Sequence, residues 1–190
     1  MRTAMTFLSA LSTGYDRVCD RTLKFFQGVA YKCWVVAFPW VLDSLQTGSL
    51  LPEENYEIVG DTSGGENTFG AKHSRLSREH LFTDFCLACV GDSREMPKES
   101  LHELLTVCGA TVVDDPIGLL SKVAKFKIIV RCSDSSIVPT SAELDMFNGL
   151  YKHMGLLTVM REWVLDSLGS YRLQPLIEYV LNTGVTNVPF

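Results

Sequence analysis

Trp40-Val41-Leu42-Asp43-Ser44-Leu45 recurs, residue for residue, as Trp163-Val164-Leu165-Asp166-Ser167-Leu168. The two copies lie 163 − 40 = 123 residues apart. That distance is far too long for the repeat unit of a solenoid, and it matches the size of one small domain. The sequence therefore predicts two copies of one domain, with this hexapeptide in the same late helix of each.

Composition and charge exclude several classes of protein. The chain has 190 residues, of which 46% are hydrophobic and 21% are charged, as in globular proteins. The longest apolar run, Cys33–Leu42, is about half of what a bilayer span needs. The net charge of −5 disfavours binding to the phosphate backbone of nucleic acids. We therefore expect neither a membrane nor a nucleic acid as a partner.

The cysteines and histidines give no sign of a metal site or of catalysis. Cys86-x-x-Cys89 is the only CxxC motif, and no second pair of ligands follows at zinc-site spacing. Most cysteines lie in apolar surroundings, which is typical of reduced thiols in a nuclear or cytosolic protein. No histidine has a neighbouring nucleophile motif, and no glycine loop could cradle a phosphate. The sequence predicts no cofactor, no metal, no small-molecule substrate and no enzymatic activity.

In the second half of the chain, expected strands and helices alternate. We expect strands at 85–90, 110–113, 126–130 and 157–159, separated by helices at 97–107 and from Ser141 to Gly155. The second hexapeptide helix begins near Arg161. This alternation predicts a parallel sheet with helices on both faces.

The first half is shorter. We expect a helix within 19–30 that ends near Gly28, a strand at 34–36, and the first hexapeptide helix from Pro39 to Gly48. Only 39 residues precede Trp40, whereas 163 − 81 = 82 separate the start of the second unit from Trp163. We therefore predict a partial first repeat at 1–60, a polar linker at 61–80 and a complete second repeat at 81–190.

Neither hexapeptide helix has a polar N-cap residue, because Ala37 and Met160 occupy the expected positions. A missing cap costs about 1 kcal/mol. Both helices are therefore expected to depend on packing, with Trp40 as a core anchor of the first repeat.

Several segments together resemble a known family. Gly109-Ala110 after an amphipathic helix, and a tryptophan in the final helix, are typical of BRCT repeats. In order and content the chain is similar to a tandem BRCT region over roughly residues 13–180, on these segments: Cys19–Phe26, Trp34–Val36, Glu95–Pro97 and Arg161–Ser167. The resemblance implies an α/β fold of two BRCT repeats, each with a small four-stranded parallel sheet flanked by helices, the first one truncated at its N-terminus.

The resemblance also implies a function. Tandem BRCT repeats bind a phosphoserine peptide with an aromatic residue three positions later (+3), at the junction of the two repeats. It implies a non-catalytic module of the nuclear DNA-damage response, with phosphorylated proteins of that response as partners. Lys24, supported by Thr22, would bind the phosphate, as a compact charge suits it. Without the resemblance, Lys24 would be one solvated helix lysine among others.

The resemblance maps the pocket for the +3 aromatic residue onto five residues: Arg21 (through its backbone), Phe26, Met96, Arg161 and Leu165. Without it, Met96 and Leu165 would be ordinary core residues. Arg21 is further expected to pair with Glu162 and Asp166 and so to fix the two repeats to each other.

Two departures from the family pattern affect this prediction. Glu95 stands where the family usually has asparagine, which adds negative charge beside the pocket. Ser9-Ala10-Leu11 resembles the Ser-Gly end of the first strand, which binds phosphate in the family, but it precedes Cys19 by only 19 − 9 = 10 residues. We therefore predict weakened phosphopeptide binding and low stability.

Alternative functions remain open at this point. One is a protein-binding scaffold that does not read phosphate, and another is a BRCT module that binds DNA ends, which the acidic net charge disfavours. Some proteins with such repeats carry a RING ubiquitin-ligase module, for which these residues offer no counterpart.

Overall fold

The computed structural model describes residues 6–9, 17–65, 67–134 and 136–190. By their internal contacts, the residues form two compact units. The first comprises the chain up to Glu79 together with Asp166–Leu173, and the second comprises His80–Leu165 with Gln174–Phe190. Each unit has its own parallel strands and helices.

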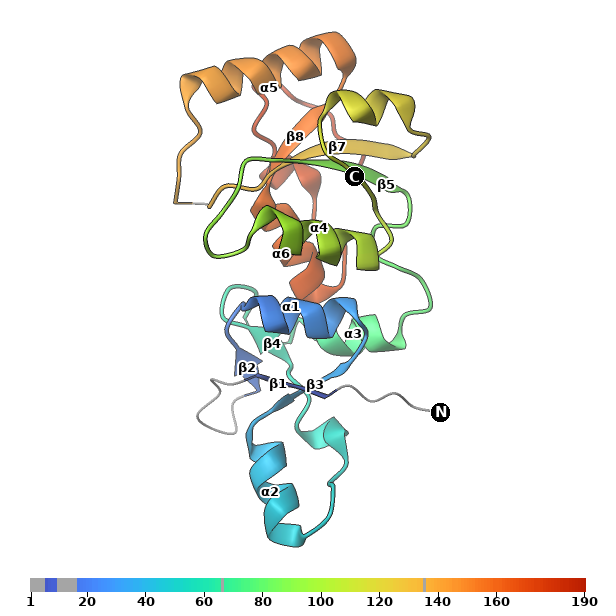
Figure 1. Cartoon of the computed structure of the whole chain (residues 1–190), viewed down its shortest axis with the longest axis vertical. Helices are drawn as coiled ribbons and strands as arrows, with labels where there is room; N and C mark the ends of the chain where they lie inside the picture. The colour runs from blue at the N-terminus through green and yellow to red at the C-terminus, as the bar shows by residue number, and fades with distance from the viewer. Residues whose placement is uncertain (1–5, 10–16, 66, 135) are drawn as a thin grey trace. The chain divides into compact units, whose positions relative to one another are not determined.

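The second unit contains a four-stranded parallel sheet in the order β6-β5-β7-β8. Figure 1 shows α5 on one side of this sheet and α4 with the start of α6 on the other. The alternation predicted from the sequence is confirmed here. The elements in chain order are β5 (Phe85–Val90), α4 (Lys98–Val107), β6 (Thr111–Val113), the 3-10 helix η2 (Ile117–Ser121), β7 (Phe126–Arg131), α5 (Ser141–Met154), β8 (Leu157–Met160), α6 (Arg161–Ser170) and the 3-10 helix η3 (Leu176–Glu178).

Trp163 is at the centre of an aromatic cluster in the second unit. It is 0% exposed, and its ring lies 5.5 Å from Phe82, 5.6 Å from Phe85 and 6.4 Å from Phe190. Strand β5 is buried along nearly its whole length, as is usual for a strand covered by helices on both faces. The second copy of the hexapeptide is therefore a core element, as the sequence predicts.

The first unit has less sheet than expected. Its described strands form two separate parallel pairs, β1 with β3 and β2 with β4. The prediction of a four-stranded sheet in each repeat is thus wrong for the described part of this unit, because the two-residue strands β2 and β4 pair only with each other. The elements are β1 (Thr6–Ser9), β2 (Val18–Cys19), α1 (Leu23–Ala30), β3 (Trp34–Ala37), α2 (Pro39–Thr47), the 3-10 helix η1 (Glu53–Asn55), β4 (Gly60–Asp61) and α3 (Gly70–Leu76).

Helix α1 continues beyond its predicted end. Gly28 is buried inside the helix, which ends at Ala30. The left-handed conformation falls instead on Lys32, at φ 57°. The Lys32 ammonium donates to the carbonyl oxygens of Ser77, at 2.9 Å, and Glu79, at 3.2 Å. These bonds help to stabilise a backbone conformation that is unfavourable for a residue with a Cβ atom.

The stretch predicted as a linker contains a packed helix. Within 61–80, α3 buries Gly70, Ala71 and Ser74, and the Ser74 hydroxyl donates to the carbonyl of Val29 in α1. The Arg75 guanidinium lies 3.3 Å from the centroid of the Trp34 ring. An irregular polar linker is therefore not what the structure shows, although the limits of the two repeats stay a prediction.

The first hexapeptide copy is mostly exposed. Helix α2 buries only Ser44, while Leu42 is 46% and Leu45 73% exposed. Trp40 is half-buried, and it packs against no other aromatic ring in the described structure. The prediction that Trp40 anchors a core is wrong, because no counterpart of the Phe82 and Phe85 rings covers it.

The hydrogen bonds of the two copies nevertheless repeat with the same offset. Trp40 Nε1 donates to the Leu51 carbonyl at 2.8 Å, and Trp163 Nε1 donates to the Gln174 carbonyl at 3.0 Å. The acceptors are also 174 − 51 = 123 residues apart. The duplication of the hexapeptide thus extends to the hydrogen bond between each tryptophan and the chain that follows its helix.

Candidate functional site

The N-terminus of α1 presents the two predicted phosphate-binding residues. Thr22 is the N-cap, and its hydroxyl accepts the backbone N–H of Phe25 at 3.3 Å. Lys24 lies in the first turn, is exposed, and makes no ion pair in the described structure. No acidic residue occupies this first turn. An anion placed here would be stabilised by the positive end of the helix and by the Lys24 ammonium.

The N-termini of α4 and α5 in the second unit differ, because carboxylates of the chain already occupy them. Asp92 accepts the backbone N–H of Lys98 at the start of α4 at 2.9 Å. That bond, and a second one from the Ser93 N–H, lower the pKa of Asp92. At α5, Glu143 forms a capping box with Thr140. A ligand anion could therefore bind at these two helix ends only by displacing a side chain of the protein.

Arg21 lies between two carboxylates of the first unit. Its Nη2 atom is 2.7 Å from Asp166 Oδ1, and its Nε is 3.7 Å from Asp61 Oδ1. The guanidinium also lies 5.5 Å from the Phe26 ring centroid. The structure thus brings together Arg21 and Asp166 of the predicted set, whereas Glu162 lies next to Arg161, at 3.5 Å.

Asp61 belongs to this cluster but was not identified from the sequence. It is 1% exposed, and its Oδ1 accepts the backbone N–H groups of Ser63 at 2.9 Å and Gly64 at 2.7 Å. A Cβ atom at Gly169 would come within 2.5 Å of Asp61 Oδ2, so this approach needs glycine. The signal in the sequence is an aspartate before Thr-Ser-Gly-Gly, a pattern typical of turns, and it falls within the linker predicted at 61–80.

In the second unit, Arg161 is 4% exposed and is surrounded by acceptors. Its Nη1 donates to Ser93 Oγ at 2.7 Å and to Asp134 Oδ1 at 2.9 Å. Its Nη2 lies 3.5 Å from Glu162 and 3.8 Å from Glu95. The hydrogen bond from Ser93, and then the Arg161 guanidinium, lower the pKa of Asp134. Arg161 is therefore held rigidly, and its charge is shared among three carboxylates.

Ser93 holds this arrangement together, and the sequence did not suggest a role for it. Its hydroxyl donates to Asp134 and accepts the backbone N–H groups of Glu95 at 3.2 Å and Met96 at 3.3 Å. The turn that carries Met96 is therefore fixed to the side chain of Arg161. A serine in a Gly-Asp-Ser loop after a strand is a weak signal by itself, because such residues are common in turns.

The five residues predicted for the +3 pocket divide between the units. Arg21 and Phe26 belong to the first unit, and Met96, Arg161 and Leu165 to the second. Phe26 is 0%, Met96 4% and Leu165 8% exposed. Side chains buried to this degree could be ordinary core residues or could form the floor of a +3 pocket. The pocket therefore stays a prediction.

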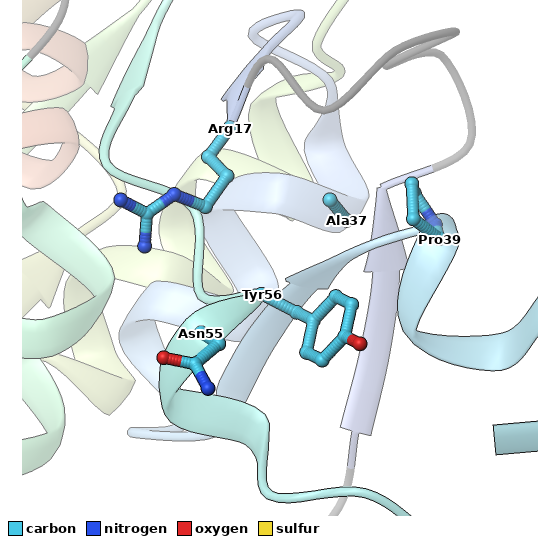
Figure 2. A pocket seen from close by; sticks show the side chains of 5 residues that line it. All are labelled: Arg17, Ala37, Pro39, Asn55 and Tyr56. Atoms are coloured by element: carbon cyan, nitrogen blue, oxygen red, sulfur yellow. The ribbon is translucent and has the colours of Figure 1, made fainter. Parts of the chain in front are cut away.

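A separate cavity lies in the first unit. It has a volume of about 220 Å³ and is lined by Arg17, Ala37, Pro39, Asn55 and Tyr56. Figure 2 shows these side chains around it. None of the predicted site residues lines this cavity.

The described residues contain no group of three His, Cys, Asp or Glu side chains that could hold a metal ion. All six cysteines are buried thiols, including Cys86 and Cys89. Burial raises the pKa of Cys33 and of Cys86, which keeps both thiols protonated and unreactive. Across the described parts of the chain, no helix combines the length and the apolar character needed to cross a bilayer.

The sequence of the chain is similar to those of known proteins. The chain is 36% identical over 175 residues to the mouse breast cancer type 1 susceptibility protein homolog, a match that covers 90% of the chain and 9% of the relative. It is 28% identical over 185 residues to BRCA1-associated RING domain protein 1 of Arabidopsis thaliana, covering 87% of the chain and 26% of that protein. The chain thus spans only a small part of the relatives that it matches. No family model matches.

Two solved structures share the fold. The BRCT5–BRCT6 domains of S. pombe Brc1 align with a TM-score of 0.55 and 16% identity, over 81% of this chain and 75% of theirs. Rtt107p in complex with a phosphorylated histone aligns with a TM-score of 0.51 and 13% identity, over 81% of this chain and 68% of that one. The chain therefore has the fold of tandem BRCT domains, and over nine-tenths of its length its sequence is similar to the breast cancer type 1 susceptibility protein.

Proposed function

We propose that this chain is a non-catalytic module that binds phosphoserine peptides with an aromatic residue at +3. The observation that carries the proposal is the start of α1, where Lys24 and the Thr22 cap face solvent at the positive end of a helix. A phosphate there gains charge-assisted hydrogen bonds without displacing a carboxylate of the protein. The +3 side chain would be received by Phe26, Met96 and Leu165, with Arg21 and Arg161 at the rim.

The comparisons support the proposal. One structural neighbour, Rtt107p, was solved with a phosphorylated histone. The similarity to the breast cancer type 1 susceptibility protein supports phosphorylated proteins of the DNA-damage response as partners, and the nucleus as the location.

We further propose that the affinity is low. Ser9 precedes Cys19 by only 19 − 9 = 10 positions, too few for the helix and strands that the family places there. The phosphate would then depend on Lys24 and Thr22 alone. Loss of one charged hydrogen bond costs about 1.5–3 kcal/mol, which corresponds to roughly a ten- to hundredfold weaker complex.

The test is a fluorescence-anisotropy titration with a labelled phosphoserine-x-x-Phe peptide and its dephosphorylated twin. We expect weak binding of the phosphorylated peptide and none of the twin. Lys24→Ala should abolish the difference, whereas Lys72→Ala, which removes an exposed lysine from α3, should leave it unchanged. Failure of the phosphopeptide to bind at all would contradict the proposal.

A second candidate is a scaffold that binds proteins without reading phosphate. It is favoured by an open groove of about 360 Å³ along α2, lined by the following residues: Trp40, Val41, Ser44, Leu45, Gly48, Ser49 and Leu50. Equal binding of the phosphorylated and dephosphorylated peptides would support this candidate instead.

A further inference from the structure

The surroundings of Arg161 carry an excess of negative charge. Three carboxylates lie within 4 Å of its guanidinium: Asp134 at 2.9 Å, Glu162 at 3.5 Å and Glu95 at 3.8 Å. Arg94, which directly precedes Glu95 in the sequence, is a second cation; it is exposed and makes no ion pair in the described structure. Even if Arg94 is counted, two positive charges face three negative ones. Arg161 is therefore a poor acceptor for a further anion.

Glu95 differs from the other two carboxylates, because its side chain is 79% exposed whereas those of Asp134 and Glu162 are 17% and 22% exposed. Asp134 is in addition held by the Ser93 hydroxyl. Of the three carboxylates, only Glu95 is therefore largely exposed to solvent, where a ligand can contact it. Its backbone position is fixed, since its N–H group donates to Ser93 Oγ at 3.2 Å.

We propose that Glu95 is a specificity-determining residue that selects peptides with lysine or arginine directly after the aromatic residue, at +4. The same charge would discriminate against an acidic residue at +4 and against a free carboxylate on the aromatic residue itself. This inference rests on the proposed function, because it assumes that Met96 helps to receive the +3 side chain.

The position follows from sequence adjacency and ligand direction. Consecutive residues of an extended peptide are about 3.3 Å apart, so a ligand residue next to the aromatic one comes within reach of Glu95, the neighbour of Met96. Within the peptide, three residues separate +4 from the phosphoserine. The residue at +4 is therefore the neighbour of the aromatic residue that lies further along the peptide from the phosphate.

The expected effect is modest, because Glu95 is exposed. An exposed ion pair contributes up to about 1 kcal/mol, or about fivefold in affinity. Exchanging lysine for glutamate at +4 replaces attraction by repulsion, so we expect about a fivefold or slightly larger ratio of Kd values at low salt. Raising the ionic strength to about 0.5 M should bring the ratio close to one, since the screening length falls to roughly 4 Å.

The experiment measures three phosphoserine-x-x-Phe peptides by anisotropy: one with lysine at +4, one with glutamate at +4, and one that ends in phenylalanine with a free carboxylate. The chain is studied as it stands and as Glu95→Gln, Glu95→Lys and Asp145→Asn. Asp145 is an exposed carboxylate on α5, across the sheet from α4 (Figure 1), so its removal changes the net charge equally without altering the surroundings of Arg161.

We expect the lysine peptide to bind best, Glu95→Gln to remove the preference, Glu95→Lys to reverse it, and Asp145→Asn to retain it. If all three peptides bind equally and in a phosphate-dependent manner, the inference is overturned while the proposed function stands. If none of them binds, the proposed function fails, and the inference fails with it.

Discussion

Trp40 and Trp163 allow the same substitution to be made at equivalent points of the two hexapeptides. Each ring donates one hydrogen bond to a carbonyl eleven residues later, so Trp→Ala removes the same bond, worth about 1 kcal/mol. Beyond that bond, Trp163→Ala vacates a site that is 0% exposed and lined by Phe82, Phe85 and Phe190. A change of this kind in a core costs about 3–5 kcal/mol. For the half-buried Trp40 we expect a total loss of about 1–2 kcal/mol.

The assay is urea denaturation followed by circular dichroism at 222 nm, which does not depend on the removed fluorophore. Because the two units need not unfold together, amide hydrogen exchange should accompany it, resolved by segment. We expect Trp163→Ala to lower protection throughout β5, β7 and β8, and Trp40→Ala to lower it only near α2 and η1. Equal losses of stability in the two variants would refute the conclusion that only the second copy belongs to a core.

Three further outcomes are expected. Leu45→Lys should change stability by less than about 0.5 kcal/mol, since Leu45 is 73% exposed; a larger shift of the urea midpoint would show that the Leu45 side chain is packed. Asp61→Ala should lower the free energy of unfolding by up to about 3 kcal/mol. The substitution removes one of the two carboxylates beside Arg21, and it leaves the N–H groups of Ser63 and Gly64 without an acceptor. An unchanged urea midpoint would contradict this. The pKa of Asp134 is lowered in the folded state, so its contribution to stability is present above its ordinary pKa of 3.8 and is lost as the pH falls through the lower, folded value. Asp134→Asn should therefore lose stability less steeply in acid titrations as the pH falls below 3.8.

The second unit could be predicted well from the sequence because its signals are local and repeated. The buried strand from Phe85 to Val90 and the Gly155 helix end are both visible in short windows, and the structure has them where they were expected. The alternation of strands and helices then fixes the sheet as parallel. Packing of the aromatic cluster adds stability, but it does not alter the pattern.

The first unit was less predictable because its contacts link segments that are far apart in the chain. Asp61 gains a role only when Arg21 and Gly169 are beside it. The polar composition of 61–80 is typical of a linker, yet Arg75 stacks on Trp34 and Ser74 bonds to Val29. Neither contact leaves a trace in sequence periodicity. In the same way, Ser93 acquires its function from Asp134 and Arg161, which are 41 and 68 residues away.

The two hexapeptides show which properties a short sequence determines by itself. Both copies form a helix, both end in a left-handed residue, Gly48 at φ 67° and Tyr171 at φ 50°, and both tryptophans find a carbonyl acceptor at the same spacing. Those features depend on neighbours in the chain, and so they repeat. Burial depends on residues elsewhere in each unit, which is why Trp163 is enclosed by Phe82, Phe85 and Phe190 while Trp40 is not. An exact repeat is therefore a reliable sign of equal local structure, but equal function additionally requires the segments that cover it.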